Sequence, residues 1–126
     1  MLSTVRARAR ALYEWYQRPS TKEQRGQKLL REWLSPEQLL QFEQQKYFEV
    51  IGSYTGRRYR IKCGRELNVF ELDDFGLIRT GWCFIPNDRT LVAGDVMLAQ
   101  KVALETNELG ALAVAKMFTP RGALSS

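Results

Sequence analysis

The clearest strand pattern in the sequence is "GRRYRIKCGR", residues 56–65. Apolar and basic side chains alternate from residue 58 to residue 63, and alternation of period two predicts a strand with one buried and one exposed face. The buried face would hold Tyr59, Ile61 and Cys63, and the exposed face would hold Arg58, Arg60 and Lys62. The glycines before and after this run predict turns at both ends of the strand.

Three more strands are predicted around this one, at residues 48–53, 68–72 and 77–85. Short turns separate them, and residues 73–76 combine two turn-forming aspartates with a glycine suited to positive φ. Gly81 marks a bulge within the last strand. Four short strands joined by tight turns predict an antiparallel meander.

Helix signals precede and follow the strands. Ser3 or Thr4 caps a first helix that Pro19 ends, and residues 20–23 and 35–38 each place a capping serine three positions before a glutamate or glutamine. These two helices would pack through Leu29, Leu30 and Trp33 and through Leu39, Leu40 and Phe42. A last helical stretch, residues 95–118, is divided where Thr106 or Asn107 caps a second helix. Its predicted buried stripe is Leu98, Val102, Leu109, Leu112 and Ala113.

Together these elements predict an α+β fold. A basic helical segment (residues 1–46) precedes a small α+β domain (47–120), in which a C-terminal helix covers a four-stranded antiparallel meander, and a flexible tail (121–126) follows. No apolar run reaches the roughly 18 residues of a membrane span. Two cysteines are too few for a disulfide scaffold, so a reduced, cytoplasmic protein is expected.

Four words in the sequence carry a resemblance: "GSYTGRRYRI", "NVFELD", "GWCFIP" and "AGDVMLAQKVALE". With them, residues 48–118 resemble a family of short domains from bacterial and phage sequences. The resemblance covers a little over half of the chain and implies that these residues form one folding unit. It implies no catalytic residue, because no activity is established for that family.

Residues that the sequence lacks exclude several kinds of chemistry. There is no histidine, which removes histidine-dependent nucleophilic catalysis and histidine zinc sites. Cys63 and Cys83 form no CxxC pair, and each continues an apolar pattern that predicts burial and low reactivity. No glycine-rich phosphate loop is present. We therefore expect a protein that is not an enzyme and has no catalytic residue, no metal and no cofactor.

One acidic cluster has two interpretations. Glu71, Asp73 and Asp74 resemble the carboxylates that hold Mg²⁺ in nucleases. Two aspartates before a Phe-Gly pair are also ordinary turn residues, and no second carboxylate group is placed opposite them. The turn interpretation is favoured.

The net charge of +5 lies in the first quarter of the chain. Residues 1–31 contain eight Lys or Arg and two Glu, a net charge of +6, and the other 95 residues contain eleven basic and twelve acidic side chains, a net charge of −1. This is a basic arm on a nearly neutral body, a pattern typical of proteins that bind polyanions.

The basic arm and the basic strand face together predict a surface for nucleic acid or another polyanion. Side chains two apart on a strand are separated by about 6.6 Å, close to the phosphate spacing of a nucleic-acid strand. The candidate contacts are Arg57, Arg58, Arg60, Lys62, Arg65, Arg6, Arg8 and Arg10, with Tyr54 and Trp82 as stacking surfaces. The competing interpretation is a solvated strand face whose charges prevent edge-to-edge aggregation.

A second hypothesis is a protein-interaction or assembly protein of the kind that phages encode. It would dock on an acidic partner or on another copy of itself. Its candidate anchors are Trp15, Tyr16 and Trp33, because aromatic residues dominate interface energetics. The alternative for these three is packing within the helical segment. A third hypothesis is a small phosphorylated ligand held between sheet and helix. No membrane partner is expected.

Overall fold

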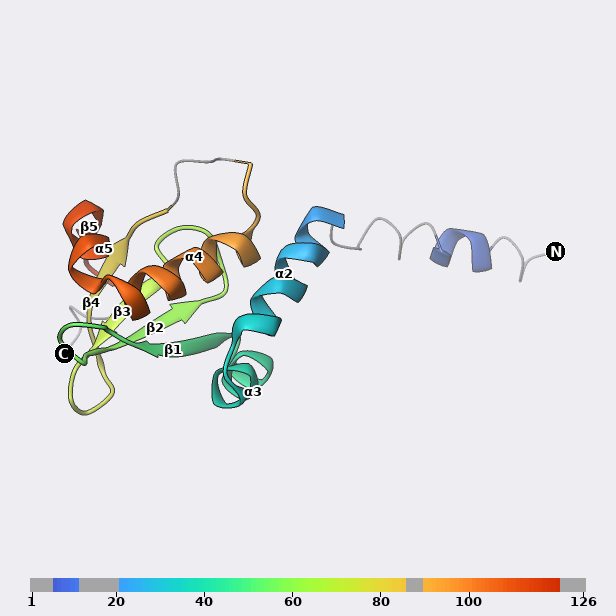
Figure 1. Ribbon diagram of the computed structural model, residues 1–126. Helices are drawn as coiled ribbons and strands as arrows, with labels where there is room; N and C mark the ends of the chain where they lie inside the picture. The colour runs from blue at the N-terminus through green and yellow to red at the C-terminus, as the bar shows by residue number, and fades with distance from the viewer. Residues whose placement is uncertain (1–5, 12–20, 86–89, 121–126) are drawn as a thin grey trace.

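Helices and one antiparallel sheet make up the structure, a computed structural model that describes residues 6–11, 21–85 and 90–120 (Figure 1). The helices are α2 (Thr21–Trp33), α3 (Pro36–Gln45), α4 (Ala93–Thr106) and α5 (Glu108–Val114). The strands are β1 (Tyr47–Ile51), β2 (Arg58–Lys62), β3 (Val69–Leu72), β4 (Ile78–Cys83) and β5 (Lys116–Phe118). Residues 6–11 are also helical, whereas the predicted helix signals at residues 3, 4 and 19 and the tail 121–126 lie outside the described residues.

The sheet confirms the α+β class and adds a strand to the predicted meander. Within the described ranges its strands lie in the order β1-β2-β3-β4-β5, and each neighbouring pair is antiparallel. The helix predicted to run to Phe118 ends earlier, at Val114. Ala115 takes extended dihedrals (φ −80°, ψ 157°), and the following residues pair with β4.

The glycine of β4 has a different role from the predicted bulge. Gly81 pairs with Phe118, whose ring lies so close that a Cβ on residue 81 would be 2.3 Å from a ring carbon. The same ring meets Phe70 edge to face, with centroids 5.6 Å apart. The register shifts between Glu71 and Leu72, which leaves Arg79 as the extra residue, so the bulge lies in β4 as predicted but not at Gly81. Glycine at residue 81 therefore allows an aromatic ring to cover the sheet.

The core lies between one face of the sheet and the helices α4 and α5, which Figure 1 shows above the strands. From the strands it contains Phe48, Val50, Tyr59, Ile61 and Val69. The N-terminal helices add Leu30, Leu34 and Phe42, and the rings of Phe42 and Phe48 meet edge to face at 6.0 Å. Side chains from both sides of the predicted boundary at residues 46–47 thus pack in one core.

Two predicted helix boundaries are confirmed by their caps. Ser35 accepts a hydrogen bond from the N–H of Gln38 at 3.1 Å, and the Gln38 side chain accepts one from the N–H of Ser35 at 3.0 Å. Asn107 separates α4 from α5, and its side chain accepts a hydrogen bond from the N–H of Gly110 at 3.2 Å. Both caps satisfy N–H groups that have no partner inside the helix.

The buried side of α4 differs from the predicted stripe. Val102 is 42% exposed, whereas the helix buries Val96, Met97, Gln100, Lys101 and Leu104. The stripe was wrong because it followed the apolar residues, while two of the buried positions are polar. Gln100 exchanges hydrogen bonds with the buried Asn68 at 2.8 and 3.0 Å, and Lys101 pairs with Glu105.

Several other apolar residues that were predicted to pack are exposed. Leu109 and Ala113 of α5 face solvent, and Leu98 and Leu112 are only half-buried. On the N-terminal helices, Leu29, Trp33 and Leu40 are 41%, 60% and 58% exposed. Both α2 and α3 bury fewer of their apolar side chains than predicted, and the others remain on the surface.

Two glycines lie where α2 crosses the beginning of α4. A Cβ on Gly94 would be 2.3 Å from the carbonyl carbon and 2.4 Å from the carbonyl oxygen of Gly26. A Cβ on Gly26 would meet Cγ2 of Val92 at 2.6 Å. The two backbones are therefore in contact, and no side chain larger than hydrogen fits at residue 94.

Gly94→Ala should lower the free energy of unfolding by about 1 to 3 kcal/mol, because the added methyl group forces two backbones apart. Gly26→Ala is the matched variant. Its new methyl group meets the end of a valine side chain, which can rotate, so its loss should be smaller. Urea unfolding of the three proteins measures both values. A Gly94→Ala protein as stable as the parent would contradict the backbone contact.

Candidate polyanion interface

The predicted basic stripe (Arg58, Arg60 and Lys62 of β2) lies on the face of the sheet opposite the core. Tyr59 and Ile61, which alternate with it, are fully buried at 0% exposure. Arg58 and Lys62 are exposed, and Arg60 is half-buried. The alternation predicted for residues 58–62 is therefore confirmed.

A glutamate on the neighbouring strand compensates part of the charge of the stripe. Glu49 is directly opposite Arg60 in the register of β1 and β2. Its carboxylate lies 3.0 Å from Nη2 of Arg60 and 3.5 Å from Nη1 of Arg58. The stripe and Glu49 together keep a positive charge, because three basic side chains face one carboxylate.

Two aromatic rings lie under the cationic groups of the stripe. The guanidinium of Arg60 is 4.3 Å from the ring centroid of Tyr47, and Nζ of Lys62 is 4.7 Å from that of Phe70. Such contacts contribute about 0.5 to 1 kcal/mol each at exposed sites. They hold both cationic groups against the sheet and so reduce the ordering cost of binding an anion there.

The stripe is not on an edge strand. β2 is hydrogen-bonded to β1 on one side and to β3 on the other. The edge beside it belongs to β1, where the N–H of Glu49 donates to Gln41 Oε1 at 3.0 Å and its carbonyl oxygen accepts from Gln38 Nε2 at 2.9 Å. Side chains of α3 therefore cover this edge, and the basic residues of β2 are not needed to block aggregation.

Two of the predicted contacts lie away from the stripe. Arg57 Nη1 is 3.6 Å from Glu71, and Trp82 Nε1 donates to Glu71 at 3.2 Å. Glu71 is 2% exposed and pairs with Tyr59 in the register, so it belongs to the face that carries the core. Trp82 is next to Val69 on that face. The prediction of a Trp82 stacking surface beside the stripe is therefore wrong.

The remaining basic candidates are exposed but separate from the stripe. Arg65 follows β2 in the loop that leads to β3. Arg6, Arg8 and Arg10 are all exposed on the helical residues 6–11. These side chains are accessible to a large anion.

The aromatic candidates have different environments. Tyr54 is 74% exposed in the β1–β2 loop, and Trp33 is 60% exposed on α2. Trp15 and Tyr16 lie outside the described residues. The exposure of Trp33 agrees with a surface anchor and not with the alternative of packing within the helical segment.

The two cysteines are less buried than predicted. Cys63 is exposed and Cys83 is half-buried. The alternation fails at Cys63 because β2 ends at Lys62, and the N–H of Cys63 donates instead to the carbonyl oxygen of Lys46 at 2.9 Å. Its side chain leaves the sheet and lines a cavity beside Arg65.

The acidic cluster is divided between two environments. The Asp73 carboxylate accepts hydrogen bonds from the N–H groups of Phe75 and Leu77, both at 2.9 Å, which is ordinary turn geometry. Glu71 is buried beside Trp82, away from this turn. Among the residues that the structure describes, no group of three His, Cys, Asp or Glu side chains could hold a metal ion.

A buried carboxylate that the sequence analysis did not single out lies under the β1–β2 loop. Glu108, the first residue of α5, is 0% exposed. Its oxygens accept hydrogen bonds from the N–H groups of Tyr54 (3.0 Å) and Thr55 (2.7 Å) and from the hydroxyls of Thr55 (2.6 Å) and Tyr59 (2.5 Å). Tyr59 gave one signal for this site in the sequence, because a tyrosine on a buried strand face needs a partner for its hydroxyl.

These hydrogen bonds fix the protonation of the pair. Burial by itself would raise the pKa of Glu108, but the hydrogen bonds from Thr55, Tyr59 and Tyr54 outweigh it and hold this pKa below the ordinary value. Burial and the hydrogen bond to Glu108 raise the pKa of Tyr59 well above its ordinary value. Glu108 is therefore charged and Tyr59 neutral at physiological pH, and the pair ties α5 to the loop.

Comparisons with known proteins give no assignment: no family model, no curated protein and no solved structure matches the chain. The resemblance of residues 48–118 to short bacterial and phage domains stays a prediction. None of the helices in the described ranges has the length and apolar character needed to span a bilayer.

Glu108→Gln should destabilise the protein most near neutral pH. A carboxylate whose pKa is lowered by folding contributes stability above its unfolded pKa, here near 4.5, and loses this contribution as the pH falls through the folded pKa. We expect a loss of about 2 to 4 kcal/mol near pH 7, because charged hydrogen bonds are removed. The difference from the parent should shrink below about pH 4.

Urea unfolding at several pH values measures this difference. Glu66→Gln is the control, because Glu66 is exposed in the β2–β3 loop. A difference between the parent and Glu108→Gln that does not change with pH would show that the carboxylate is not charged in the folded protein.

Proposed function

We propose that the chain is a non-enzymatic module that binds nucleic acid or another polyanion, mainly through backbone phosphates. The observation that carries the proposal is the exposure of the charge excess. Residues 1–31 carry a net charge of +6. The basic residues of this segment that the structure describes and that are exposed are Arg6, Arg8, Arg10, Lys22, Arg25 and Lys28. Charges that are exposed and concentrated in one segment produce the field that a polyanion meets first.

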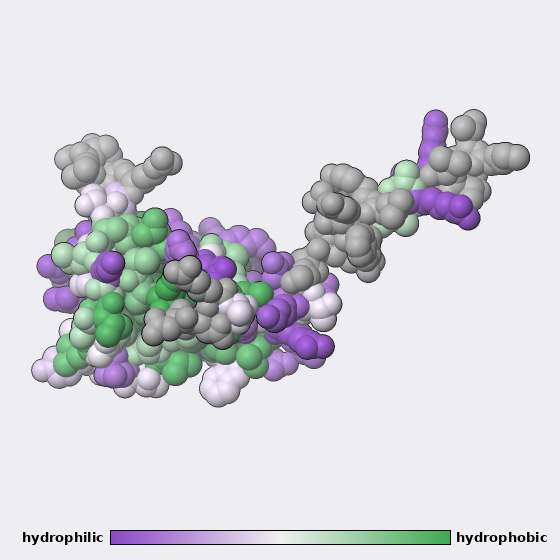
Figure 2. All heavy atoms as spheres, turned by 90° about the horizontal axis from the view of Figure 1, so that it is seen from above, coloured by the Kyte–Doolittle hydropathy of each residue, from purple (hydrophilic) through white to green (hydrophobic). Residues whose placement is uncertain are grey.

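The helix α2 supports this proposal with a continuous exposed stripe. Lys22, Arg25, Leu29 and Trp33 are spaced three or four residues apart and are all exposed. Residues with this spacing lie next to one another on a helix surface. Cations that can meet phosphates are therefore followed along the same line by an aromatic ring on which a base can stack. Figure 2 shows hydrophilic side chains gathered at the α2 end of the body.

The stripe on β2 supplies a second contact surface. Its arginines already pair with Glu49. The Arg58 guanidinium is exposed and makes the longer contact, 3.5 Å, so a phosphate can compete for it more easily than for the half-buried Arg60. Because β2 is an interior strand, edge protection does not explain three basic residues there. The stripe on β2 would therefore contribute less to binding than the basic N-terminal segment, and its contribution would be sensitive to salt.

The absence of an enzymatic role is part of the proposal. Among the described residues, Glu108 has the most deeply buried carboxylate. Both of its oxygens accept hydrogen bonds from the protein itself. A carboxylate so engaged has no lone pair directed at a substrate. Binding therefore remains the better interpretation of the charge pattern than catalysis.

A protein-interaction role is the second candidate, favoured by the exposed apolar side chains of α2 and α3. Leu29 and Trp33 are one helical turn apart on α2, and Leu40 is exposed on α3. Aromatic and aliphatic anchors of this kind dominate protein interfaces. The partner in this case would be an acidic protein surface or a second copy of the chain.

Two variants with equal charge change test the proposed function. One replaces Arg6, Arg8 and Arg10 with Gln, and the other replaces Arg58, Arg60 and Lys62 with Gln. Each lost phosphate contact lowers the slope of log affinity against log salt by about 0.7 to 0.9. We expect a decrease of roughly 2 to 3 for the first variant and a smaller one, roughly 1 to 2, for the second, because Glu49 already competes there.

Binding of a mixed-sequence single-stranded DNA and of heparin, measured from about 50 to 200 mM salt, gives these slopes. If neither variant changes the slope, or if the parent binds neither ligand, polyanion binding is wrong. Purification at low salt then separates the candidates: a large assembly that is free of nucleic acid and that Trp33→Ser disperses supports the interaction protein.

Glu49→Gln should have the opposite effect and strengthen DNA binding. Removing the carboxylate frees the guanidinium groups of Arg58 and Arg60, so the log–log salt slope should increase by about 0.7 to 0.9 for each additional phosphate that they bind. Glu37→Gln is the matched control, because it makes the same charge change at an exposed position of α3. Equal binding by both variants would show that only net charge matters and that the stripe makes no specific contact.

A further inference from the structure

A cavity of about 500 Å³ lies where α2, the end of α3, the start of the β2–β3 loop and the beginning of α4 meet. Its walls include Phe42, Val92 and the exposed Cys63. Cavities of this size hold small organic ligands in other proteins. It lies on a different part of the chain from the stripe of β2, since none of Arg58, Arg60 and Lys62 lines it.

The charged lining of the cavity is predominantly basic. Arg31 of α2, Lys46 at the end of α3 and Arg65 after β2 all line it, and Glu23 is the acidic residue among the lining side chains. Three cations from three separate elements converge on one space. Basic side chains placed around one space suit an anion with two or more charges.

The surrounding structure holds the side chain of one of these residues and the backbone of another. Arg31 Nε lies 2.6 Å from Glu43, and its Nη1 lies 3.3 Å from the side-chain oxygen of Gln27. Lys46 caps α3 in the left-handed conformation (φ 63°), with its N–H donating to the carbonyl oxygen of Phe42 at 3.0 Å. A site with fixed side chains loses less conformational entropy when a ligand binds.

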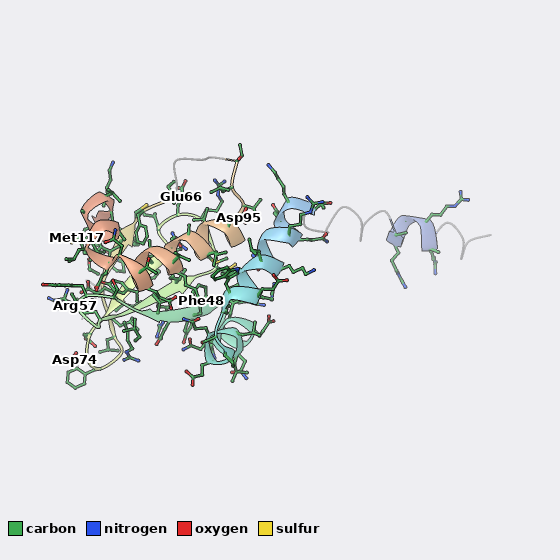
Figure 3. The ribbon with its side chains drawn as sticks, viewed as in Figure 1. Phe48, Arg57, Glu66, Asp74, Asp95 and Met117 are labelled. Carbon is green, nitrogen blue, oxygen red and sulfur yellow. The ribbon has the colours of Figure 1, made fainter. Side chains whose placement is uncertain are left out.

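The start of α4 adds to the positive potential of the cavity. Val92 is the N-cap and has no side-chain oxygen to accept hydrogen bonds from the first N–H groups of the helix, and Val92, Ala93 and Gly94 line the cavity. The N-terminus of a helix carries about half a positive charge. Asp95 opposes it in the first turn, on the end of α4 that faces α2 (Figure 3).

We infer that this cavity binds a terminal phosphate group, with Arg31, Lys46 and Arg65 as its ligands. The two negative charges of a phosphate monoester would meet three cations that are already offset in part by two carboxylates, Glu23 on the cavity wall and Glu43 bonded to Arg31. The volume exceeds that of the phosphate alone, and the apolar wall formed by Phe42 and Val92 would contact the organic part of the ligand. Two sources supply this chemistry: a small phosphorylated molecule and the phosphorylated end of a nucleic-acid strand.

Cys63 provides a direct reading of occupancy, because its exposed side chain lines the cavity. In a Cys83→Ala protein, a neutral maleimide reports on Cys63 alone. Inorganic phosphate should slow the labelling several-fold at saturation, while sodium chloride of equal ionic strength should not. The melting temperature should rise with phosphate concentration over the same range, as binding to the folded state requires.

Lys46→Gln/Arg65→Gln should abolish this protection, so that labelling rates with and without phosphate become equal. Arg58→Gln/Arg60→Gln makes the same charge change outside the cavity and should keep the protection. Far-UV circular dichroism and the melting temperature without phosphate establish that both variants fold. Absence of protection in the parent, or equal protection in both double variants, would overturn the inference.

The two sources of the phosphate are distinguished by their probes. A nucleoside monophosphate tests the small ligand, and oligonucleotides of one sequence with either a 5′-phosphate or a 5′-hydroxyl end test the strand end. Protection by the monophosphate alone assigns a small ligand, and stronger protection by the phosphorylated oligonucleotide assigns a strand end. The inference does not depend on the proposed polyanion surface, whose failure would appear in the salt slopes while the phosphate protection of Cys63 persisted.

Discussion

The contact between the backbones of α2 and α4 at Gly26 and Gly94 determines where most other parts of the molecule lie. Because the two helices touch there, Leu30 and Leu34 of α2 reach the core that the sheet forms with α4. The opposite side of α2 is left in solvent with its basic and aromatic side chains. The same crossing places Arg31 beside the first turn of α4, so that both line one cavity. Interiors are packed too closely to absorb an added methyl group at such a point without moving one helix. The two glycines at this crossing thus set the position of the exposed face of α2 and of the cavity.

Buried polar groups fix the other helices. Glu108 joins α5 to the β1–β2 loop, and the paired amides of Gln100 and Asn68 join α4 to the start of β3. Among the described residues, no buried side-chain nitrogen or oxygen lacks a partner. A buried polar group that loses its partner costs about 1 to 3 kcal/mol, more than a satisfied one contributes. Shifted arrangements of α4 or α5 would leave several such groups unpaired, so these clusters select one arrangement over its neighbours.

Local patterns in the sequence predicted the parts of the fold that local physics controls. Alternation identified β2 and its buried face, and the capping residues Ser35 and Asn107 marked helix boundaries that the structure has. What failed depends on contacts distant in sequence. The burial of Gln100 requires Asn68 as a partner, and β5 exists because residues 116–118 pair with β4. The stacking site at Trp82 failed for the same reason, since the register decides which face of the sheet a residue occupies. The basic stripe itself was predictable, whereas its compensation by Glu49 was not, because that pairing depends on the register of β1 with β2.

The two candidate anion sites differ in how many phosphate groups each of them can contact. The stripe already carries the carboxylate of Glu49, so a phosphate there adds little beyond what it displaces, and added salt weakens the exchange further. The cations of the cavity are exposed too, with Lys46 and Arg65 in solvent and the Arg31 side chain 38% exposed, so salt also screens them. A strand of many phosphates can sum weak contacts along the arm and the stripe, which a single phosphate cannot do. A single phosphate can instead enter the cavity, where three cations act on it at once. Under the two proposals, added salt should weaken the binding of a strand more steeply than the binding of a single phosphate, because the strand makes more phosphate contacts.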